Sequence, residues 1–463
     1  MKIYNTLTRS KEELTAAAAE RTLTVYACGP TVYNYIHIGN ARPLCVFDVL
    51  RRWLEHEGYT VRFVQNFTDI DDKLIRRAAE EDTTVPELAE RYIKEFETDA
   101  AGLNIRPDTL HPRATENIDA ILTLIDTLVE KGFAYQSGGD VYFRAARFDG
   151  YGKLSHQPLD ELVAGARINP GEAKESPSDF ALWKAAKPGE PFWPSAYGDG
   201  RPGWHIECSA MAGRFLGKTV DIHCGGQDLI FPHHENEIAQ SECANGCDFA
   251  RYWMHNGYIN VDNKKMSKSE GNFFTVREVA ERYGYEPIRY FMLAAHYRSP
   301  INYTPELIEQ SKSALERLYT CRRNLEHEIA ANVQSEENAA LTAALPAARE
   351  AFGAAMEDDL NTADALAAVF DLVRACNTAV AVHVPATELK AALALLDELC
   401  GLLGLLETKA DDSLDAEVEG LIARRAEARA AKNWAEADLI RDHLNEMGIE
   451  LEDTPSGIKW RKR

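Results

Sequence analysis

The chain has 463 residues, of which 45% are hydrophobic and 27% are charged, and its formal net charge is −22. One hydrophobic core cannot organise a chain of this length, so we expect two or more domains. The amino terminus lacks the apolar stretch of a secretory signal, and the longest apolar-looking segment, residues 391–406, is interrupted by Asp397 and Glu398 and is too short to cross a bilayer. We therefore expect a cytoplasmic protein with no membrane partner.

The nine cysteines are scattered along the chain, and an odd number in a long chain is a poor disulfide framework. Reduced thiols and a metal site fit better. The negative charge argues against a nucleic-acid partner, because phosphate binding depends on Lys and Arg. The net charge is an average over the whole molecule, however, and says nothing about local basic patches. Four of the last five residues are basic, so the charge does not exclude a nucleic-acid partner.

The first elements in chain order predict a nucleotide-binding sheet. Residues 23–28 alternate as a strand does, and Gly29-Pro30-Thr31 ends that strand. Residues 40–57 carry apolar side chains at helical spacing, and residues 60–65 read as a second strand. A strand–loop–helix–strand unit predicts an α/β fold with a Rossmann-like parallel sheet, whose site lies at the carboxyl ends of the strands.

The later elements predict an insertion and two further modules. The pattern loosens between residues 107 and 203, resumes as a strand at 219–224, and becomes helical from 304 to 406, as in a helix bundle. One or two charged helices at 421–447 and a hairpin from 449 to 460 follow. We predict domain boundaries as follows: the sheet domain, 1–112 and 204–250; the insertion, 113–203; a region after the resumed sheet, 251–312; the helical bundle, 313–408; and a carboxyl-terminal α+β module, 409–463.

Two separate motifs favour phosphate binding. His37-Ile38-Gly39-Asn40 opens the predicted helix, and a helix amino terminus attracts phosphate, although a capped helix with a satisfied histidine would look the same. Lysines cluster with Ser and Gly in residues 264–272, which could neutralise a triphosphate or could simply be a solvated charged loop. Together, roughly 230 residues apart, the motifs resemble the paired signatures of class I aminoacyl-tRNA synthetases.

A third motif, Phe231-Pro232-His233-His234-Glu235-Asn236-Glu237, reads as the start of a helix with Pro232 in its first turn. His233 and Glu237 then share one helix face, and a His and a carboxylate so placed suit zinc, which needs two more ligands. Cys28, after the first strand, and Cys208, expected at the edge of the resumed sheet, are candidates. Spacing alone does not choose Cys208 over Cys224, Cys243 or Cys247, and all could be structural cysteines.

Segments along nearly the whole chain resemble bacterial cysteinyl-tRNA synthetases, among them CGPTVYNYIHIGNARP, NFTDIDDK, GWHIECSAM, DIHCGGQDLIFPHHENEIAQSE and NKKMSKSEGNF. The resemblance implies one zinc ion per chain, held by Cys28, Cys208, His233 and Glu237. It implies that His37 and Lys268 stabilise the triphosphate in catalysis. The other residues that it implies are, for ATP, Gly39, Asn40, Gly225, Gly226, Asp228 and Lys265, and for cysteine, Thr68, Trp204 and His223. Asn40 departs from the class signature, which has a second His there, so proton transfer at this position is in doubt.

The resemblance implies a ligase that activates L-cysteine with Mg²⁺-ATP and transfers it from cysteinyl-adenylate to the 3′ end of tRNA(Cys). It also implies a monomer without an editing domain, and an anticodon-binding module in which Trp434, Arg441 and Trp460 are candidate contacts. Two alternatives stay open: a ligase that transfers cysteine to the amine of an amino-sugar, and a non-catalytic RNA- or zinc-binding relative.

Overall fold

The computed structural model describes residues 1–16, 21–107, 110–158, 174–265, 272–331, 338–406, 412–454 and 457–462. The chain divides into two compact units. The first unit contains residues 1–308 and 356–361, and the second contains residues 309–355 and 362–463. Lys268 lies outside the described residues.

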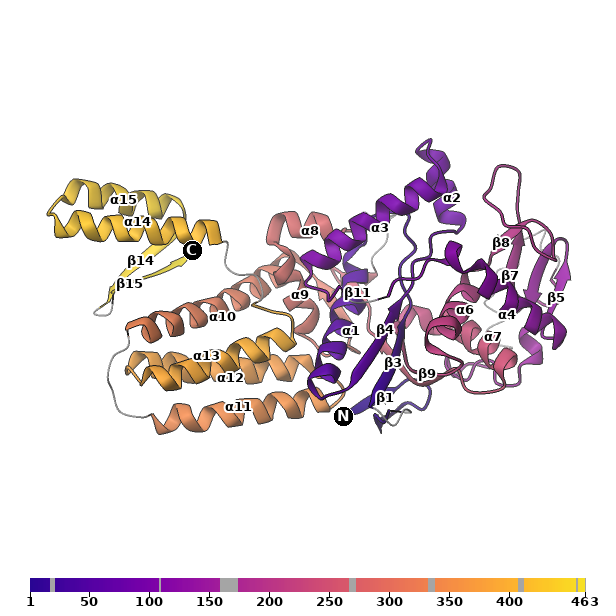
Figure 1. The fold of residues 1–463 in the computed structure, drawn as a ribbon, viewed down its shortest axis with the longest axis horizontal. Coiled ribbons are helices and arrows are strands. Elements are labelled where there is room, and N and C mark those ends of the chain that lie inside the picture. The colour runs from indigo at the N-terminus through magenta and orange to yellow at the C-terminus, as the bar shows by residue number, and fades with distance from the viewer. Residues whose placement is uncertain are drawn as a thin grey trace. The chain divides into compact units, whose positions relative to one another are not determined.

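A four-stranded parallel sheet organises the first unit. Its strands lie in the order β10-β9-β3-β4 and have these bounds: β3, Thr22–Ala27; β4, Thr60–Gln65; β9, Val220–Gly226; β10, Ala250–Asn256. Figure 1 shows α1 (Ile38–His56) on one side of these strands and α6 (Trp204–Leu216) and α7 (Glu235–Asn245) on the other. Right-handed crossovers require this arrangement. From β3 the chain continues to β4 on one side of the sheet, and from β9 it continues to β10 on the other side. The strand order therefore changes direction between β3 and β9, and parallel sheets of this kind bind ligands at such a point.

The predicted fold class is confirmed, and the predicted sheet elements agree with the structure to within two residues at each end. The strand predicted at 60–65 has those bounds, and the helix predicted from residue 40 begins two residues earlier, at Ile38. The earlier start has a local cause, since His37 and Asn40 form a reciprocal capping box at this end of α1. The sequence did not predict β10, whose ARYWMHN segment shows no alternation because nearly all of it is buried.

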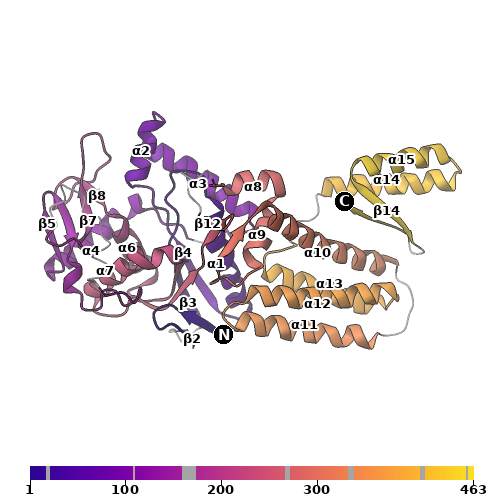
Figure 2. The same ribbon diagram turned by 180° about the vertical axis from the view of Figure 1, so that it is seen from behind.

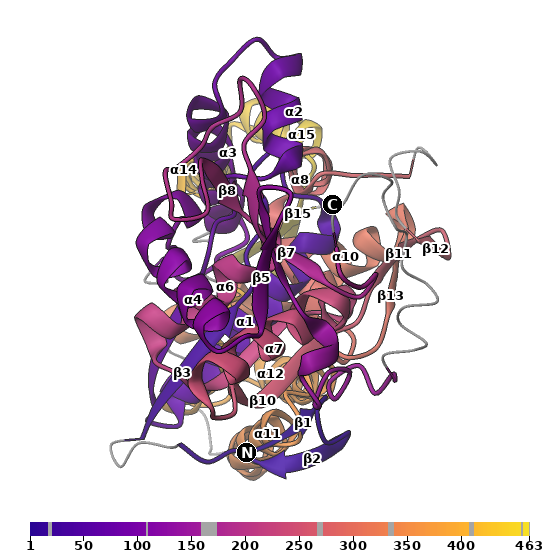
Figure 3. The ribbon, with the colours of Figure 1, turned by 90° about the vertical axis from the view of Figure 1, so that its right-hand side faces the viewer.

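The rest of the first unit surrounds the sheet. An amino-terminal hairpin pairs β1 (Lys2–Asn5) with β2 (Ser10–Glu13), and a small sheet has the order β12-β11-β13, which Figure 3 shows as a separate group of strands. The strands of the small sheet are β11 (Ile259–Val261), β12 (Lys264–Lys265) and β13 (Ile301–Tyr303). The remaining helices outside the insertion are α2 (Asp72–Glu80), α3 (Val85–Gly102), α8 (Val276–Tyr283) and α9 (Tyr285–Leu293).

The described residues of the predicted insertion form a helix and an antiparallel sheet. Its elements are α4 (Ile118–Glu130), β5 (Ala134–Ser137), β6 (Asp140–Phe143), β7 (Phe180–Ala185) and β8 (Gly200–Pro202). Buried side chains of this segment, including Ile125, Val141 and Leu182, form one core with Ile206 of α6 and Ala239 of α7. The insertion thereby fixes the two helices that cover one face of the parallel sheet.

The second unit is mainly helical. Figure 2 shows a bundle of four helices that run alongside one another, namely α10 (Pro305–Ala331), α11 (Ala339–Glu357), α12 (Thr362–Ala381) and α13 (Ala386–Leu402). A smaller module contains α14 (Asp412–Ala430), α15 (Trp434–Glu446) and the antiparallel strands β14 (Ile449–Thr454) and β15 (Gly457–Lys462). Val418, Ile440, Leu444 and Ile449 form the core of this module. The predicted hairpin is confirmed, and the finer domain boundaries stay a prediction.

Within the described part of the chain, every helix is too short or too polar to span a membrane.

Candidate active site and metal centre

Four side chains from three parts of the fold converge beside the carboxyl end of β3. Cys28 follows β3, Cys208 lies in the second turn of α6, His233 precedes α7, and Glu237 lies in the first turn of α7. One donor atom from each lies within 4.8 Å of the other three. The Sγ atoms of Cys28 and Cys208 are 3.7 Å apart, and Glu237 Oε1 is 3.3 Å from Cys28 Sγ and 3.1 Å from His233 Nε2. Two thiols, an imidazole and a carboxylate at these distances could hold a metal ion.

The structure distinguishes between the four cysteines that spacing left open. Cys224 is buried within β9 with its Sγ 3.5 Å from the carbonyl oxygen of Tyr26, and Cys247 is exposed. Cys243 packs in the core shared by the insertion and α7. Only Cys208 belongs to the donor cluster found among the described residues. Its expected position was wrong, because residues 204–208 begin a helix after Gly203 and do not extend the sheet.

The expected start of the helix at residues 231–237 was also wrong. Residues 230–234 form a wider turn in which Phe231 has extended backbone angles, φ −137° and ψ 134°, and the α-helix begins at Glu235. A residue that precedes proline is disfavoured in the helical region, which accounts for the delay. His233 and Glu237 nevertheless face each other, since the turn continues directly into the helix.

The middle residues of the same motif anchor α7 to the insertion. The Glu235 carboxylate accepts hydrogen bonds from the backbone N–H groups of Gly152, Leu154 and Ser155 at 2.8–3.4 Å. Asn236 Oδ1 accepts a hydrogen bond of 2.5 Å from the hydroxyl of Tyr151. Glu235 and Asn236 therefore fix the start of the helix that presents Glu237.

Glu237 is fully buried between two imidazoles, with His223 Nε2 at 2.9 Å from its second carboxylate oxygen. Burial alone would raise the pKa of Glu237, but His223 and His233 together hold it well below its usual range. Burial likewise opposes the charge on His233, yet the Glu237 carboxylate raises the pKa of His233 to about 10. The hydrogen bond from Cys28 lowers the pKa of the Cys208 thiol to about 6. A cation could replace the protons that this cluster holds.

A second group of imidazoles, which the sequence did not predict, lies beside the donor cluster. His205 Nδ1 lies 3.0 Å from His233 Nδ1, and burial lowers the pKa of His205 well below its usual value. A neutral His205 can therefore accept the hydrogen bond of His233, which leaves His233 Nε2 directed at Glu237. His234 Nδ1 contacts His255 Nε2 at 2.8 Å, and His255 Nδ1 contacts Thr6 at 2.7 Å.

The three residues predicted for the cysteine pocket occupy different positions. Trp204 is 42% exposed, lines the neighbouring cleft, and its ring centroid lies 4.4 Å from that of His233. His223 is fully buried against Glu237 and belongs to an overlapping donor set with Cys28, His234 and Glu237. Thr68 is also buried and donates a 2.9 Å hydrogen bond to the Glu207 carboxylate.

A cleft of about 510 Å³ opens beside the cluster at the carboxyl ends of β3 and β9. The predicted site residues that line it are Cys28, His37, Gly39, Asn40, Trp204, Gly226 and Asp228. The amino terminus of α1 borders the cleft, where its free N–H groups and partial positive charge favour an anion. Lys73 from α2 adds a positive charge to the lining.

The segment that follows the lysine-rich motif lies against the start of α1. The backbone N–H of Ile38 donates to the carbonyl of Phe274 at 3.1 Å, and the N–H of Val276 donates to the carbonyl of Ile36 at 2.9 Å. The ring of His37 makes an edge contact with Phe273 at 5.3 Å between centroids. Residues that directly follow the lysine-rich loop therefore pair with the start of α1. The backbone of Lys265 pairs with Asn260 in the small sheet.

Asn40 has a clear structural role. Its Oδ1 accepts a 3.1 Å hydrogen bond from the backbone N–H of His37, which caps α1. Asn40 thus holds the helix end whose N–H groups face the cleft.

A close approach to another backbone segment explains Gly29, whereas Gly225 and Gly226 lie against side chains. A Cβ atom at Gly29 would lie 1.6 Å from the carbonyl oxygen of Asn66, and one at Gly226 would lie 2.4 Å from Asp228 Oδ1. A Cβ atom at Gly225 would meet the His234 ring at 3.0 Å. A side chain at Gly29 would push apart the ends of β3 and β4, which border the cleft.

Similar solved structures define the class of the fold. The structure of Mycobacterium tuberculosis methionyl-tRNA synthetase in complex with methionyl-adenylate aligns with a TM-score of 0.62 and 18% identity, covering 85% of this chain and 93% of that one. A putative arginyl-tRNA synthetase from Campylobacter jejuni aligns with a TM-score of 0.57 and 14% identity, covering 83% and 93%. Together with the strand order and the paired motifs, these similarities define the fold of a class I aminoacyl-tRNA synthetase.

Sequence comparisons narrow the class to one family. The family model described as tRNA synthetases class I (C) catalytic domain matches residues 14–313, the DALR domain matches 351–407, and the cysteinyl-tRNA ligase anticodon binding domain matches 411–461. A cysteine–tRNA ligase of Symbiobacterium thermophilum is 56% identical, covering 100% of this chain and 99% of that one. Another, from Caldicellulosiruptor saccharolyticus, is 55% identical over 99% of both. The chain belongs to the cysteine–tRNA ligase family.

Proposed function

We propose that this enzyme activates L-cysteine with ATP to cysteinyl-adenylate and transfers the cysteinyl group to the 3′ end of tRNA(Cys). The observation that carries the proposal is the Cys28–Cys208–His233–Glu237 cluster at the border of a cleft whose other wall is a helix amino terminus. A thiol-binding group beside a phosphate-binding site suits a reaction that joins the carboxylate of cysteine to the α-phosphate of ATP. Relatives 53–56% identical over the whole chain carry the name of this activity.

Positioning and charge stabilisation account for the first step, because the carboxylate of cysteine is itself the nucleophile. The α1 N–H groups and His37 would hold phosphate oxygens, with Lys265 and Lys268 supplying positive charge and Mg²⁺ accompanying the nucleotide. Gly39 and Asn40 would keep the helix end open to the phosphates. Gly225, Gly226 and Asp228 would hold the adenosine, with the Asp228 carboxylate directed at the ribose.

The metal is proposed to be zinc, since two thiolates, an imidazole and a carboxylate are a donor set that zinc accepts. When bound, zinc would supply a position for the substrate thiolate. Glu237 and His233 would fix the site from α7, and Trp204, Thr68 and His223 would enclose the rest of cysteine. A hydrophobic pocket separates substrates that differ by one small group by only about 1–3 kcal/mol, so a sulfur-specific ligand is the better means of rejecting serine.

The acceptor is argued from the second unit. Residues 411–461 match an anticodon-binding family, and Trp434, which is 58% exposed, Arg441 and Trp460 are proposed contacts to unpaired bases. Transfer to an amino-sugar, the alternative prediction, is not supported, because a ligase with that acceptor is expected to lack an anticodon-binding module. A binding protein without catalysis is not favoured either, since all four donors converge. A monomeric state and a cytoplasmic location remain predictions from the sequence.

Charging of purified tRNA with labelled cysteine tests the proposal, with serine and an amino-sugar as control substrates. We expect ATP-dependent charging with cysteine alone. Cysteine activation without transfer to tRNA would indicate a different acceptor, and the absence of activation would contradict the proposed enzyme.

Replacing one donor tests the metal assignment separately. Cys208→Ala should lower both the zinc content and cysteine-dependent ATP–pyrophosphate exchange, because two thiolates provide most of the soft ligand character. Cys243→Ala, a buried cysteine outside the cluster, is the matched control and should keep both. Normal zinc content in Cys208→Ala would show that Cys208 is not a ligand.

A further inference from the structure

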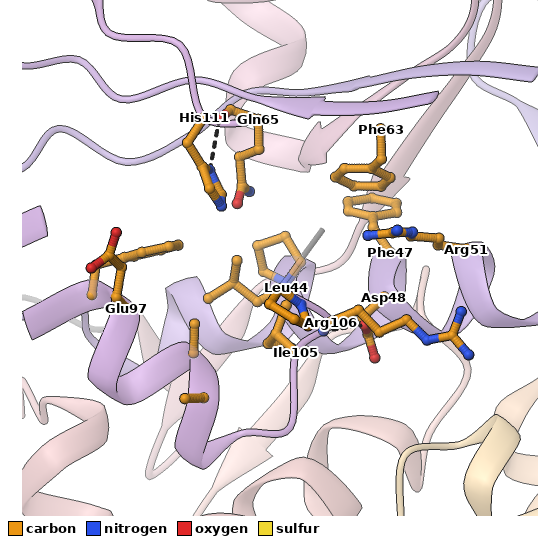
Figure 4. A pocket seen from close by; sticks show the side chains of 15 residues that line it. Leu44, Phe47, Asp48, Arg51, Phe63, Gln65, Glu97, Ile105, Arg106 and His111 are labelled. Atoms are coloured by element: carbon orange, nitrogen blue, oxygen red, sulfur yellow. Dashed lines mark hydrogen bonds between the residues drawn. The ribbon is translucent and has the colours of Figure 1, made fainter. Parts of the chain in front are cut away.

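A second cavity, of about 280 Å³, lies in the first unit between α1, β4, α3, residues 105–107 and His111; we name it the α1–α3 pocket. Figure 4 shows its lining, in which Leu44 and Ile105 lie across an open space from His111 and Gln65, and the rings of Phe47 and Phe63 lie at one end. No residue of the proposed zinc or nucleotide sites lines it. Its walls are mainly aromatic and aliphatic, with a few polar groups at defined positions, as small-molecule sites are.

His111 presents a hydrogen-bond acceptor to this cavity. Its Nδ1 lies 2.9 Å from the carbonyl oxygen of Gln65, and because a carbonyl only accepts, Nδ1 must carry the hydrogen. Burial lowers the pKa of His111, so the ring is neutral and its Nε2 is an acceptor. Stacking on Phe67, with centroids 4.8 Å apart and 15° between planes, fixes the orientation of the ring.

Gln65 adds an amide that points into the same space (Figure 4). The residue is only 7% exposed, and its side-chain amide makes no hydrogen bond to the described part of the chain. The amide is therefore open toward the cavity and can form a hydrogen bond to a molecule there. Together, Gln65 and His111 place an amide and an acceptor side by side at one wall.

The charges around the pocket favour a neutral occupant. Arg51 Nε donates to Glu55 at 2.9 Å, and Arg106 pairs with the same carboxylate. The two guanidinium groups that line the pocket share the one carboxylate of Glu55, and the carboxylate of Glu97 balances the positive charge that remains. Glu97, which also lines it, disfavours an anion further.

We propose that the α1–α3 pocket binds a small, neutral, planar aromatic molecule that carries one N–H or O–H donor. The donor pairs with His111 Nε2, the Gln65 amide binds a second polar atom, and the ring lies against Phe47, Phe63 and Phe96. An apolar cavity of about 150 Å³ binds benzene, so 280 Å³ can hold a bicyclic ring system. The inference does not depend on the proposed aminoacylation.

The pocket also shares a wall with the nucleotide cleft. Pro43, Leu44, Gln65 and Phe96 line both cavities. An occupant of the α1–α3 pocket therefore lies behind the nucleotide site, and it binds while ATP is present.

Indole and benzofuran are the probes for the first test, because benzofuran replaces the N–H of indole by oxygen at nearly the same shape. Isothermal titration of the full-length enzyme, at saturating ATP, should show one indole site per chain. Benzofuran should bind about fivefold more weakly, the effect expected for one neutral hydrogen bond. Equal affinity of the two probes, or no binding of indole up to its solubility limit, overturns the proposal.

A cavity-filling variant locates the site. Ala100 of α3 lines the pocket, and Ala100→Phe should abolish indole binding, whereas Thr98→Phe, on the exposed face of the same helix, should retain it. Ala100→Leu is the milder replacement if the larger one does not fold. Soaked crystals of the unaltered enzyme give an independent reading: indole beside His111 supports the proposal, and indole only in the nucleotide cleft contradicts it.

Discussion

Glu237 shows how single side chains set the chemistry of this site. Each of its carboxylate oxygens contacts a different imidazole, His223 at 2.9 Å and His233 at 3.1 Å, and none of the three is solvent-exposed by more than 2%. A buried carboxylate is costly unless it is paired and hydrogen-bonded. The same contacts leave Oε1 beside two thiols, so the residue that stabilises the imidazoles also completes the donor set.

His205 offers a test of how such a ligand is oriented. His205→Ala should weaken zinc binding by about 10- to 100-fold, because His233 loses the acceptor that fixes its ring. Competition with a chelator measures the affinity, and cysteine activation should recover at excess zinc. His443→Ala, an exposed histidine of the second unit, is the control. Unchanged zinc affinity in His205→Ala would falsify the positioning role.

Among the helices, α1 contributes to two different sites along its length. Its amino terminus borders the nucleotide cleft and is capped by Asn40. Its third turn buries Asp48, which accepts hydrogen bonds from Arg52 Nε at 2.8 Å, Arg289 Nη2 at 2.5 Å and the backbone N–H of Arg106 at 2.9 Å. The helix thus connects the substrate site to a buried ion cluster that joins it to α9.

Two variants of Asn40 separate capping from charge. Asn40→Ala removes the side-chain acceptor and should lower the free energy of unfolding by about 1 kcal/mol. Asn40→Asp keeps an acceptor but places a negative charge beside the phosphates, so it should retain stability and raise the KM for ATP. Thermal denaturation and pyrophosphate exchange measure the two effects. If both variants changed KM equally, charge at this position would not matter.

The buried ion cluster predicts a dependence of stability on pH. Burial alone would raise the pKa of Asp48, but Arg289 and Arg52 lower it below the ordinary value. A depressed carboxyl pKa stabilises the fold fully above the unfolded pKa of about 3.9, and this stabilisation is lost as the pH falls through the lower folded value. Acid unfolding of the first unit should therefore be steepest below about pH 4.

Asp48→Asn should remove the pH-dependent stabilisation that Asp48 provides. It should also destabilise the first unit by about 3–5 kcal/mol at neutral pH, because Arg289 would keep a buried charge without its partner. Denaturant titrations at about pH 3 and at pH 7 measure the change, because the pH-dependent part is lost only below about pH 4. Asp149→Asn, an exposed site on the same unit, provides the comparison and should leave both values unchanged. A variant as stable as the parent at pH 7 would contradict the assigned role of the cluster.

On the scale of the whole molecule, the chain separates the site of chemistry from the module matched to anticodon binding. The cleft and the donor cluster belong entirely to the first unit, and residues 411–461 belong to the second. The module at the carboxyl terminus has its own small core. Its removal should leave the first unit folded.

Deletion of residues 413–463 should accordingly spare cysteinyl-adenylate formation and weaken charging of tRNA. Pyrophosphate exchange and tRNA charging, measured on the same preparation, give the two rates. Transfer from preformed cysteinyl-adenylate to a short acceptor-stem RNA is the control, and it should be unaffected. Equal loss of exchange and charging would instead indicate that the module is needed for folding.

The sequence predicted local elements well, because periodicity and turn residues act over a few residues. It therefore placed β3, α1 and β4 closely, and the i, i+4 relation of His233 and Glu237 held. The sequence could not predict that β3 pairs with β9 across the insertion. Spacing alone therefore left four cysteines as candidate metal ligands, and only the resemblance favoured Cys208. The second group of histidines was missed for the same reason, since His205, His234 and His255 meet only when distant segments pack.

The pairing of β3 with β9 also governs when the site can form during synthesis. Thr24 bonds to Asp221 across 197 residues, and Cys28 meets Glu237 across 209. A ribosome that has not yet released α7 therefore holds a chain with at most three of the four donors, Cys28, Cys208 and His233, and Glu237 is missing. Contacts so distant in sequence form slowly. Retention of the proposed metal thus requires a chain that extends beyond residue 237, and a nascent chain truncated before that residue lacks the complete donor set.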